Sequence, residues 1–118
     1  RQKNALFLNR HLANIKGLII PMAPENVTHV YHQFTLRITS KFPLSRDKFV
    51  ENMRQKGIGV EVYYPIPIHK QIFFSHKRKC LLRLPETELA AKEVVSLPIH
   101  PGLSKKDLER IVETIISL

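Results

Sequence analysis

Apolar residues recur along this chain with two different spacings, and the alternation between them limits the folds that the chain can adopt. In residues 2–15, apolar side chains recur every three or four positions, which predicts one buried face of an amphipathic helix. In residues 30–38 they recur at every second position, which predicts a half-buried strand. The sequence therefore predicts a fold that mixes helices with strands.

The rest of the chain continues this alternation. Ser45 is a suitable N-cap for a helix that ends at Lys56-Gly57, and residues 58–64 follow as a second main strand with branched and aromatic side chains. Asp107 stands three residues after Ser104, as in a capping box. The other expected elements are a strand at 18–20, which follows the glycine stop of the first helix, a helix at 86–95, an extended segment at 96–98 and a last helix from Ser104.

The predicted elements indicate the fold class. A chain of 118 residues, 43% of them hydrophobic, is long enough for one domain with a modest core. It lacks the crossover lengths and glycine-rich turns of a dinucleotide-binding fold, and it has no internal repeat. We therefore expect an α+β domain with a small three- to four-stranded, mainly antiparallel sheet, helices packed on one face, and the other face available for docking.

Composition narrows the range of partners and locations. The longest apolar stretches, at 17–21 and 58–67, are far shorter than the roughly 18 to 20 residues of a membrane span, so no membrane partner is expected. The single cysteine, Cys80, cannot form an internal disulfide, which favours the cytoplasm. The formal charge of +9 favours a nucleic acid, an anionic lipid surface or a phosphorylated small molecule, or it reflects one basic domain beside an acidic neighbour.

One segment, GIGVEVYYPIPIHKQ at positions 57–71, combines a strand pattern with polar chemistry. Its strand is expected to end in Tyr63 and Tyr64, because the Pro-x-Pro that follows fixes φ and removes backbone donors. His69 and Lys70 come next, so phenol, imidazole and ammonium groups meet at one end of the sheet. Such groups suit a diphosphate or a sugar hydroxyl. The alternative is that the tyrosines are ordinary strand aromatics and His69 a loop residue.

The sequence has no motif of an independent catalytic site. It contains no G-x-S-x-G, P-loop, H-E-x-x-H or glycine-rich phosphate loop. No lysine stands in a plainly apolar setting that would make it a nucleophile. His29, His32 and His100 lie beside extended segments, where histidine is more often packed or hydrogen-bonded than catalytic. We therefore nominate no catalytic, cofactor-binding or metal-binding residue.

Segment 57–71 also resembles a stretch of the DegT/DnrJ/StrS sugar aminotransferases, in which GIG precedes an aromatic or histidine pair and then PxPxHxQ. Two further segments agree in order and spacing. HVYHQF at 29–34 resembles the beginning of a strand in that family, and SLPIHPGLS at 96–104 resembles the turn before its final helix. The resemblance spans nearly the whole chain, and it implies that residues 1–118 are the C-terminal small domain of such an enzyme.

The resemblance carries specific implications. Family members are pyridoxal-phosphate (PLP) enzymes of the aspartate-aminotransferase fold that move an amino group, usually from glutamate, onto a keto sugar carried on a nucleotide diphosphate. Their Schiff-base lysine lies in a large domain that this chain lacks, so the chain alone is expected to bind no cofactor and to be inactive. The parent enzyme is expected to be a homodimer. Tyr63 and Tyr64 correspond to the pair near the substrate diphosphate, and His69 follows as a third substrate-binding candidate.

Two departures from the family pattern stand out. Many relatives carry histidine where this chain has Tyr63, and a phenol keeps the hydrogen-bond donor but cannot become a cation near neutral pH. Residues 74–83 are also more basic than the usual glycine-containing turn, and we interpret His76 to Lys79 within them as a solvated face.

Two other functions stay open from the sequence alone. A stand-alone basic module could bind RNA or DNA through Lys77, Arg78 and Lys79, with an affinity that falls steeply as salt rises. No RNA-binding fingerprint or helix-turn-helix pattern supports it, so a nucleic-acid partner is not expected. A regulatory subunit could instead pair with a separate large-domain protein. Because the chain opens on Arg1, we expect an excised or processed piece of a longer polypeptide.

Overall fold

The structure is a computed structural model that describes residues 1–73 and 82–118. The basic residues at 76–79 and Cys80 therefore lie outside the described residues. In chain order the elements are α1 (Gln2–Leu12), β1 (Leu18–Ile19), β2 (Phe34–Ile38), α2 (Arg46–Gln55), the 3-10 helix η1 (Ile68–Lys70), α4 (Pro85–Glu93), β3 (Val94–Leu97) and α5 (Lys105–Ile116).

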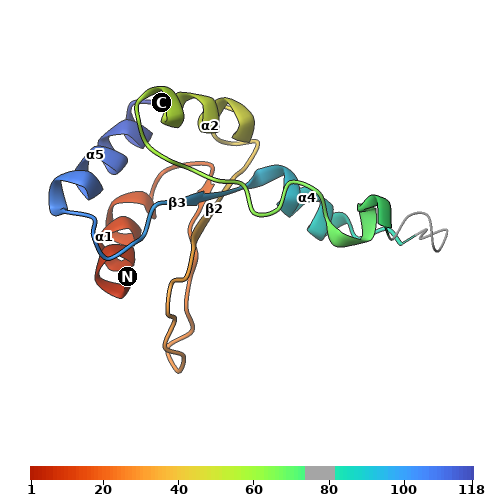
Figure 1. The fold of residues 1–118 in the computed structure, drawn as a ribbon, viewed down its shortest axis with the longest axis horizontal. Helices are drawn as coiled ribbons and strands as arrows, with labels where there is room; N and C mark the ends of the chain where they lie inside the picture. The colour runs from red at the N-terminus through yellow and green to blue at the C-terminus, as the bar shows by residue number, and fades with distance from the viewer. Residues whose placement is uncertain (74–81) are drawn as a thin grey trace.

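The three strands form one antiparallel sheet in the order β1-β2-β3. Leu18 of β1 lies opposite Ile38 of β2, and Phe34 at the other end of β2 lies opposite Leu97 of β3. β2 is thus the central strand, and the connection from β2 to β3 contains α2, η1 and α4 (Figure 1). The predicted α+β class with a small antiparallel sheet is confirmed.

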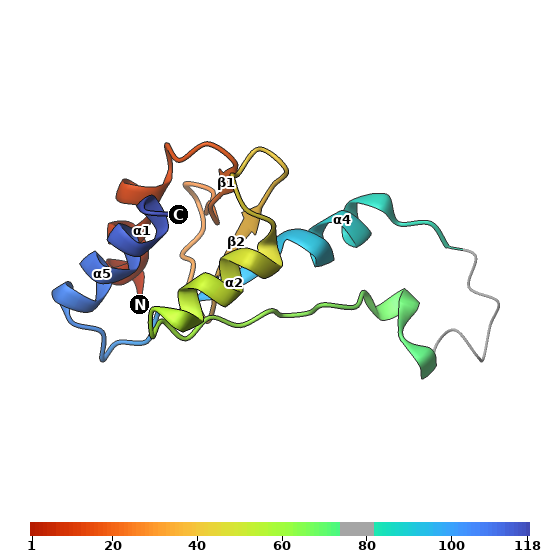
Figure 2. The same ribbon diagram turned by 90° about the horizontal axis from the view of Figure 1, so that it is seen from above.

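The core lies between one face of the sheet and the helices α1, α2 and α5 (Figure 2). Alternate side chains of β2 are buried, as the two-residue spacing predicts. Burying one large apolar side chain contributes about 1.5–3 kcal/mol, so the helix faces and the sheet stabilise each other. The largest fully buried side chains are Leu8, Leu12, Phe34, Leu36, Phe49, Met53, Val60, Val95 and Ile115.

Hydrogen bonds at the helix ends match the sequence. Ser45 Oγ accepts from the backbone N–H of Lys48 at the start of α2, at 3.4 Å. At α5, Ser104 Oγ accepts from the N–H of Asp107 at 3.2 Å, and Asp107 Oδ2 accepts from the N–H of Ser104 at 2.8 Å. This is the predicted capping box. The hydrogen bond from the Ser104 side chain, followed by the one from its backbone, lowers the pKa of the Asp107 carboxyl.

The turn after α1 depends on glycine. The helix ends at Leu12, three residues before the predicted limit, and the chain then reaches Gly17 at a φ of +87°. A Cβ at this position would stand 2.1 Å from the backbone nitrogen of Phe42. Only glycine therefore fits here, both for its left-handed backbone and for its contact with the neighbouring chain.

The strand predicted at 30–38 begins only at Phe34, so its first four residues were assigned wrongly. Tyr31 has a φ of +45°, which takes the backbone out of the extended conformation. Its N–H donates to His29 Nδ1 at 2.9 Å instead of joining the sheet ladder. Val30, expected to alternate with its neighbours, is largely exposed. Local side-chain bonding thus overrides the alternating pattern in this part.

The second main strand predicted at 58–64 is also wrong. Only Glu61 pairs with the sheet, in an isolated antiparallel bridge to Ser96. The carbonyl of Val60 accepts from the Arg54 guanidinium at 2.9 Å, and the N–H of Ile58 donates to the carbonyl of Met53 at 2.9 Å. The carbonyl of Val60 and the N–H of Ile58 therefore have their hydrogen-bond partners in α2. They are not paired with a neighbouring strand.

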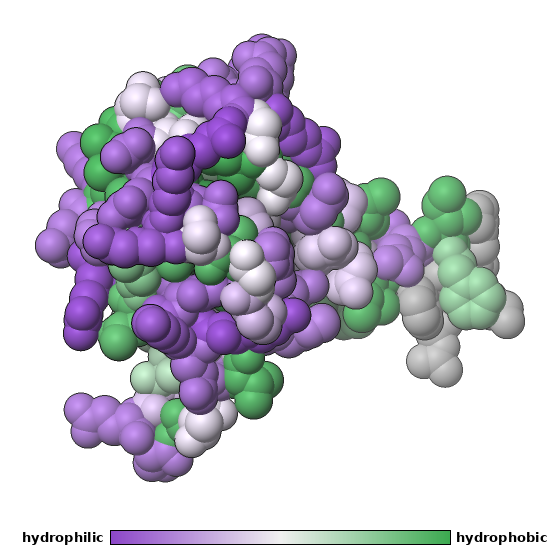
Figure 3. Space-filling view, turned by 60° about the vertical axis from the view of Figure 1, so that its left-hand side comes forward, coloured by the Kyte–Doolittle hydropathy of each residue, from purple (hydrophilic) through white to green (hydrophobic). Residues whose placement is uncertain are grey.

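An arm, defined here as residues 62–73 and 82–93, projects from the helix-covered sheet (Figures 1 and 2). It carries η1 on its outgoing limb and α4 on its returning limb. Figure 3 shows apolar side chains on the projecting part. Exposed large apolar and aromatic residues of the arm are Tyr63, Tyr64, Ile66, Ile68, Ile72, Phe73, Leu82, Leu84 and Leu89. In the part of the chain described, no helix has the length and apolar character to cross a bilayer.

Candidate functional site

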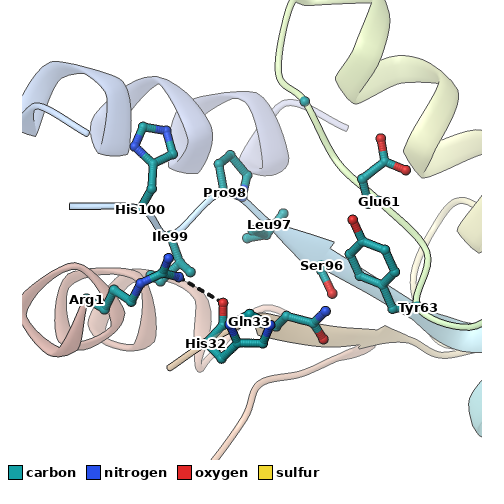
Figure 4. A pocket seen from close by; sticks show the side chains of 11 residues that line it. Arg1, His32, Gln33, Glu61, Tyr63, Ser96, Leu97, Pro98, Ile99 and His100 are labelled. Carbon is teal, nitrogen blue, oxygen red and sulfur yellow. Dashed lines mark hydrogen bonds between the residues drawn. The ribbon is translucent and has the colours of Figure 1, made fainter. Parts of the chain in front are cut away.

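A hollow of about 280 Å³ opens beside the end of β3 (Figure 4). Four chain segments meet there: the first residue, the segment before β2, the segment that leads into the arm, and the turn after β3. Its lining residues are Arg1, His32, Gln33, Gly59, Glu61, Tyr63, Ser96, Leu97, Pro98, Ile99 and His100.

The bridge between Glu61 and Ser96 places Tyr63 in this hollow. The N–H of Glu61 donates to the carbonyl of Ser96 at 3.2 Å, and the N–H of Ser96 donates back to Glu61 at 2.7 Å. Two residues later, the Tyr63 ring lies beside Ser96 and Gln33 (Figure 4). Tyr63 is 43% exposed, so a ligand in the hollow can reach this residue.

The opposite side of the hollow is more basic. Arg1 Nη1 donates to the carbonyl of His32 at 2.8 Å and to that of Tyr31 at 3.3 Å. His100 lies above Arg1 in Figure 4, and its carbonyl accepts from Asn4 Nδ2 at 3.1 Å. The hollow is thus lined by a guanidinium and two histidines together with phenol and amide groups, while its one carboxylate, that of Glu61, is paired with Arg54 at 3.2 Å. This combination suits an anion with several oxygens.

Sequence reasoning missed several of these lining residues. His32 and His100 were set aside because a histidine beside an extended segment is usually packed, yet both are exposed at the hollow. One signal could have found His100. It stands three residues after the last residue of β3, and residues just beyond the end of a strand gather at the edge of the sheet.

Tyr64 is not among the residues that line the hollow. It follows Tyr63 through a cis peptide bond, and the two rings lie edge to face with their centroids 5.9 Å apart. The Tyr64 ring is 72% exposed. The pair thus presents one phenol to the hollow and one to the surface beside it.

His69 lies on the arm, away from the hollow. Its side chain is only 9% exposed, and Nε2 lies 3.2 Å from Glu88 Oε1 of α4. Lys70 Nζ contacts the other oxygen of the same carboxylate at 2.5 Å. Hydrogen bonds from Lys70 first and His69 second lower the pKa of Glu88 to about 2. The structure therefore brings only Tyr63 and Tyr64 of the three predicted residues together, and it places His69 in a polar contact inside the arm.

Comparisons with known proteins agree with this architecture. A family model for DegT/DnrJ/EryC1/StrS aminotransferases matches residues 1–116. The chain belongs to this family. The resemblance seen in three sequence segments is thereby confirmed.

Two curated relatives show how the match is distributed. A pleiotropic regulatory protein of Geobacillus stearothermophilus is 35% identical over 117 residues, which are 98% of this chain and 30% of the relative. A UDP-N-acetyl-3-dehydro-alpha-D-glucosamine 3-aminotransferase of Acidithiobacillus ferrooxidans is 34% identical over 98% of this chain and 29% of its own length. This member of the family thus spans about 30% of the length of the curated relatives that it matches.

Solved structures show the same pattern. DesV of S. venezuelae, crystallised with a ketimine intermediate, is 27% identical and superimposes with a TM-score of 0.87 over 98% of this chain and 30% of DesV. A family aminotransferase from Brucella abortus is 25% identical, with a TM-score of 0.84 over 98% of this chain and 29% of its own. The sheet and its helices are therefore a recurrent part of larger aminotransferases.

The family implies PLP, and the hollow can be tested for it. A PLP aminotransferase holds its cofactor through a lysine Schiff base. No lysine is among the residues that line the hollow. The hollow therefore does not fit the Schiff-base part of a PLP site, and we derive no step through the cofactor.

Metal binding was tested in the same way. Within residues 1–73 and 82–118, no group of three or more His, Cys, Asp or Glu could hold a metal ion.

Proposed function

We propose that residues 1–118 are the C-terminal small domain of a PLP-dependent aminotransferase that acts on a nucleotide-linked keto sugar. The observation that carries this proposal is the family match across residues 1–116, combined with a span of only 30% of the relatives' length. The remaining length of such an enzyme would supply the large domain with its lysine and cofactor. The chain alone would then have no aminotransferase activity.

The names of two relatives support a nucleotide sugar as the substrate. The relative from Acidithiobacillus ferrooxidans is named for a UDP-linked sugar, and one from Aneurinibacillus thermoaerophilus is a dTDP-3-amino-3,6-dideoxy-alpha-D-galactopyranose transaminase. Glutamate as amino donor, a homodimeric parent enzyme and a cytoplasmic location belong to the same proposal.

In this proposal the hollow beside β3 receives the diphosphate of the substrate. The Tyr63 hydroxyl donates a hydrogen bond to a phosphate oxygen, and Tyr64 does the same from the adjoining surface. Arg1 balances the phosphate charge from the opposite wall, where His32 lies beside it. His69 contributes indirectly, because its ring already faces Glu88 inside the arm.

The test is the protein encoded by the complete reading frame that contains this chain. We expect the frame to extend upstream of Arg1 by more than twice the length of this chain, since the relatives are that much longer. The purified full-length protein should bind PLP and convert a nucleotide-linked keto sugar to the amino sugar with glutamate. A start codon immediately before Arg1, or a full-length protein that does not bind PLP, would overturn the proposal.

The role of Tyr63 has its own test in that enzyme. Tyr63→Phe removes only the hydroxyl, so KM for the nucleotide sugar should rise about tenfold or more while kcat changes little, as expected for a lost hydrogen bond to a charged group outside the reacting centre. Tyr31→Phe is the matched control, because Tyr31 is buried and does not line the hollow. Equal KM values for the two variants would exclude the phenol from substrate binding.

A further inference from the structure

The Tyr63–Tyr64 pair has little packing of its own to hold it in place. Tyr63 is 43% exposed and Tyr64 is 72% exposed, and their rings contact each other edge to face. Residues 58–64 form no strand beyond the single bridge at Glu61. The position of the pair must therefore be set by the points at which the outgoing limb of the arm is attached on either side of it.

The returning limb is firmly attached to the body. Arg37 of β2 forms an ion pair with Glu93 at 2.7 Å. Arg46 of α2 donates to the carbonyls of Ala91 and Val94 at 3.2 and 3.0 Å. These contacts fix the C-terminal end of α4 against the sheet, so α4 can serve as a support for the other limb.

Glu88 connects the two limbs. It stands one and a half turns before the fixed end of α4, and its two carboxylate oxygens contact His69 and Lys70 of η1 at 3.2 and 2.5 Å. An ionised carboxylate can only accept hydrogen bonds, so His69 Nε2 donates to it. The outgoing limb is thus held at Glu61 on one side of the tyrosines and at His69 on the other. Pro65 and Pro67 stiffen the chain between these two points.

We propose that Glu88 is a positioning residue: its contact with His69 and Lys70, called the clasp below, sets the place of the Tyr63–Tyr64 pair beside the hollow. The contacts that carry this inference are those of the arm itself. The consequence for substrate binding rests on the proposed function, because only there do the tyrosines have a ligand.

Amide hydrogen exchange of the 118-residue chain tests the clasp without any ligand. Glu88→Gln keeps the size of the side chain and removes its charge, so the amides of Lys70 and Gln71, which donate to the carbonyls of Pro67 and Ile68 in η1, should exchange roughly tenfold faster. The amides of α5 should keep their rates, because the core is unchanged. Glu86→Gln is the matched control, since Glu86 is on the same helix and makes no polar contact with η1 among the described residues. Equal exchange at Lys70 and Gln71 for the two variants would overturn the proposal.

A double-mutant cycle separates the clasp from a general weakening of α4. If Lys70 acts through Glu88, Lys70→Met added to Glu88→Gln should speed exchange no further, whereas independent effects would multiply. The nuclear Overhauser contact between the Tyr63 ring and Ser96, which lie side by side at the hollow, should also weaken in Glu88→Gln and persist in Glu86→Gln. Multiplying effects, or an unchanged contact between Tyr63 and Ser96, would count against a positioning role.

Titration of the full-length enzyme with UDP-N-acetylglucosamine and with dTDP-glucose then separates the two proposals. Weaker binding in Glu88→Gln, with normal binding in Glu86→Gln, is the expected result. If the unaltered enzyme binds neither nucleotide sugar although Glu88→Gln loosens the arm, the proposed function fails and the clasp stands. If it binds and Glu88→Gln binds equally well, the positioning role of Glu88 fails and the proposed function stands.

Discussion

The helix-covered sheet and the arm are held together by different kinds of interaction. In the body, side chains from α1, α2, α5 and all three strands are buried in one apolar cluster. In the described part of the arm, the carboxylate of Glu88 joins the two limbs through polar contacts, and many apolar side chains are exposed. The stability gained from apolar burial adds up over many side chains and does not depend on pH. The stability gained from an ion pair depends on a few atoms and on their charge. The body should therefore resist most surface substitutions, and the arm should move without unfolding the body.

The largest expected effect is in the body, at Gly17. Gly17→Ala would force a left-handed backbone on alanine and press its Cβ against the backbone of Phe42, so the free energy of unfolding should fall by more than about 4 kcal/mol. Gly59→Ala, on the approach to the arm, meets nothing within 4 Å and should change stability by less than about 0.5 kcal/mol. Urea denaturation followed by circular dichroism measures both. Similar midpoints for the two variants would show that the turn at Gly17 can shift.

The next largest effect on stability is expected when a leucine is replaced by alanine in α1, and the same substitution in α4 serves as the comparison. Leu8 of α1 is fully buried, so Leu8→Ala should cost about 2–5 kcal/mol through lost burial and the cavity left behind. Leu89 of α4 is 44% exposed, and Leu89→Ala should cost less than about 1 kcal/mol. Thermal unfolding of the two variants gives the difference. An equal loss would mean that the arm is part of the cooperative core.

A smaller effect concerns the helix caps. Ser104→Ala removes the capping box of α5 and should cost about 1 kcal/mol of global stability. By contrast, α4 begins after Leu84 with no side-chain cap. Leu84→Ser should slow amide exchange in α4 while leaving the global unfolding midpoint within about 0.5 kcal/mol of its original value. A global gain as large as the loss in Ser104→Ala would contradict the separation of arm and body.

The smallest expected effect is the pH response of the arm. Because the pKa of Glu88 is lowered from 4.5 to about 2, its contribution is present in full above pH 4.5 and is lost as pH falls through about 2. The side-chain NMR signals of His69 and Lys70 should therefore shift on acidification toward pH 2. In Glu88→Gln this acid shift should be absent. If it persists in the variant, another carboxyl group holds η1.

Much of the fold could be predicted from local sequence. The helix faces around Phe49 and Leu108, the N-caps at Ser45 and Ser104, and the left-handed turn at Gly17 all follow from residues within a few positions of one another. The candidate site could be predicted only in part. Tyr63 was singled out from the sequence and lies at the hollow, and its role as a substrate-binding residue stays a prediction. The histidines of the opposite wall come from distant segments that no local pattern connects.

The sequence by itself determined which segments are helical, where α2 and α5 begin, which helix faces are apolar, and that a phenol pair precedes two prolines. Only the tertiary structure decided the hydrogen-bond partners of the backbone groups of 58–64. The guanidinium of Arg54 donates to the carbonyl of Val60, which a strand would pair with its neighbour. The tertiary structure also decided that His69 faces Glu88, nineteen residues later in the chain, and not the hollow. Hydrogen-bond partners so far apart in sequence depend on how the elements pack, and a spacing pattern within one element carries no information about that packing.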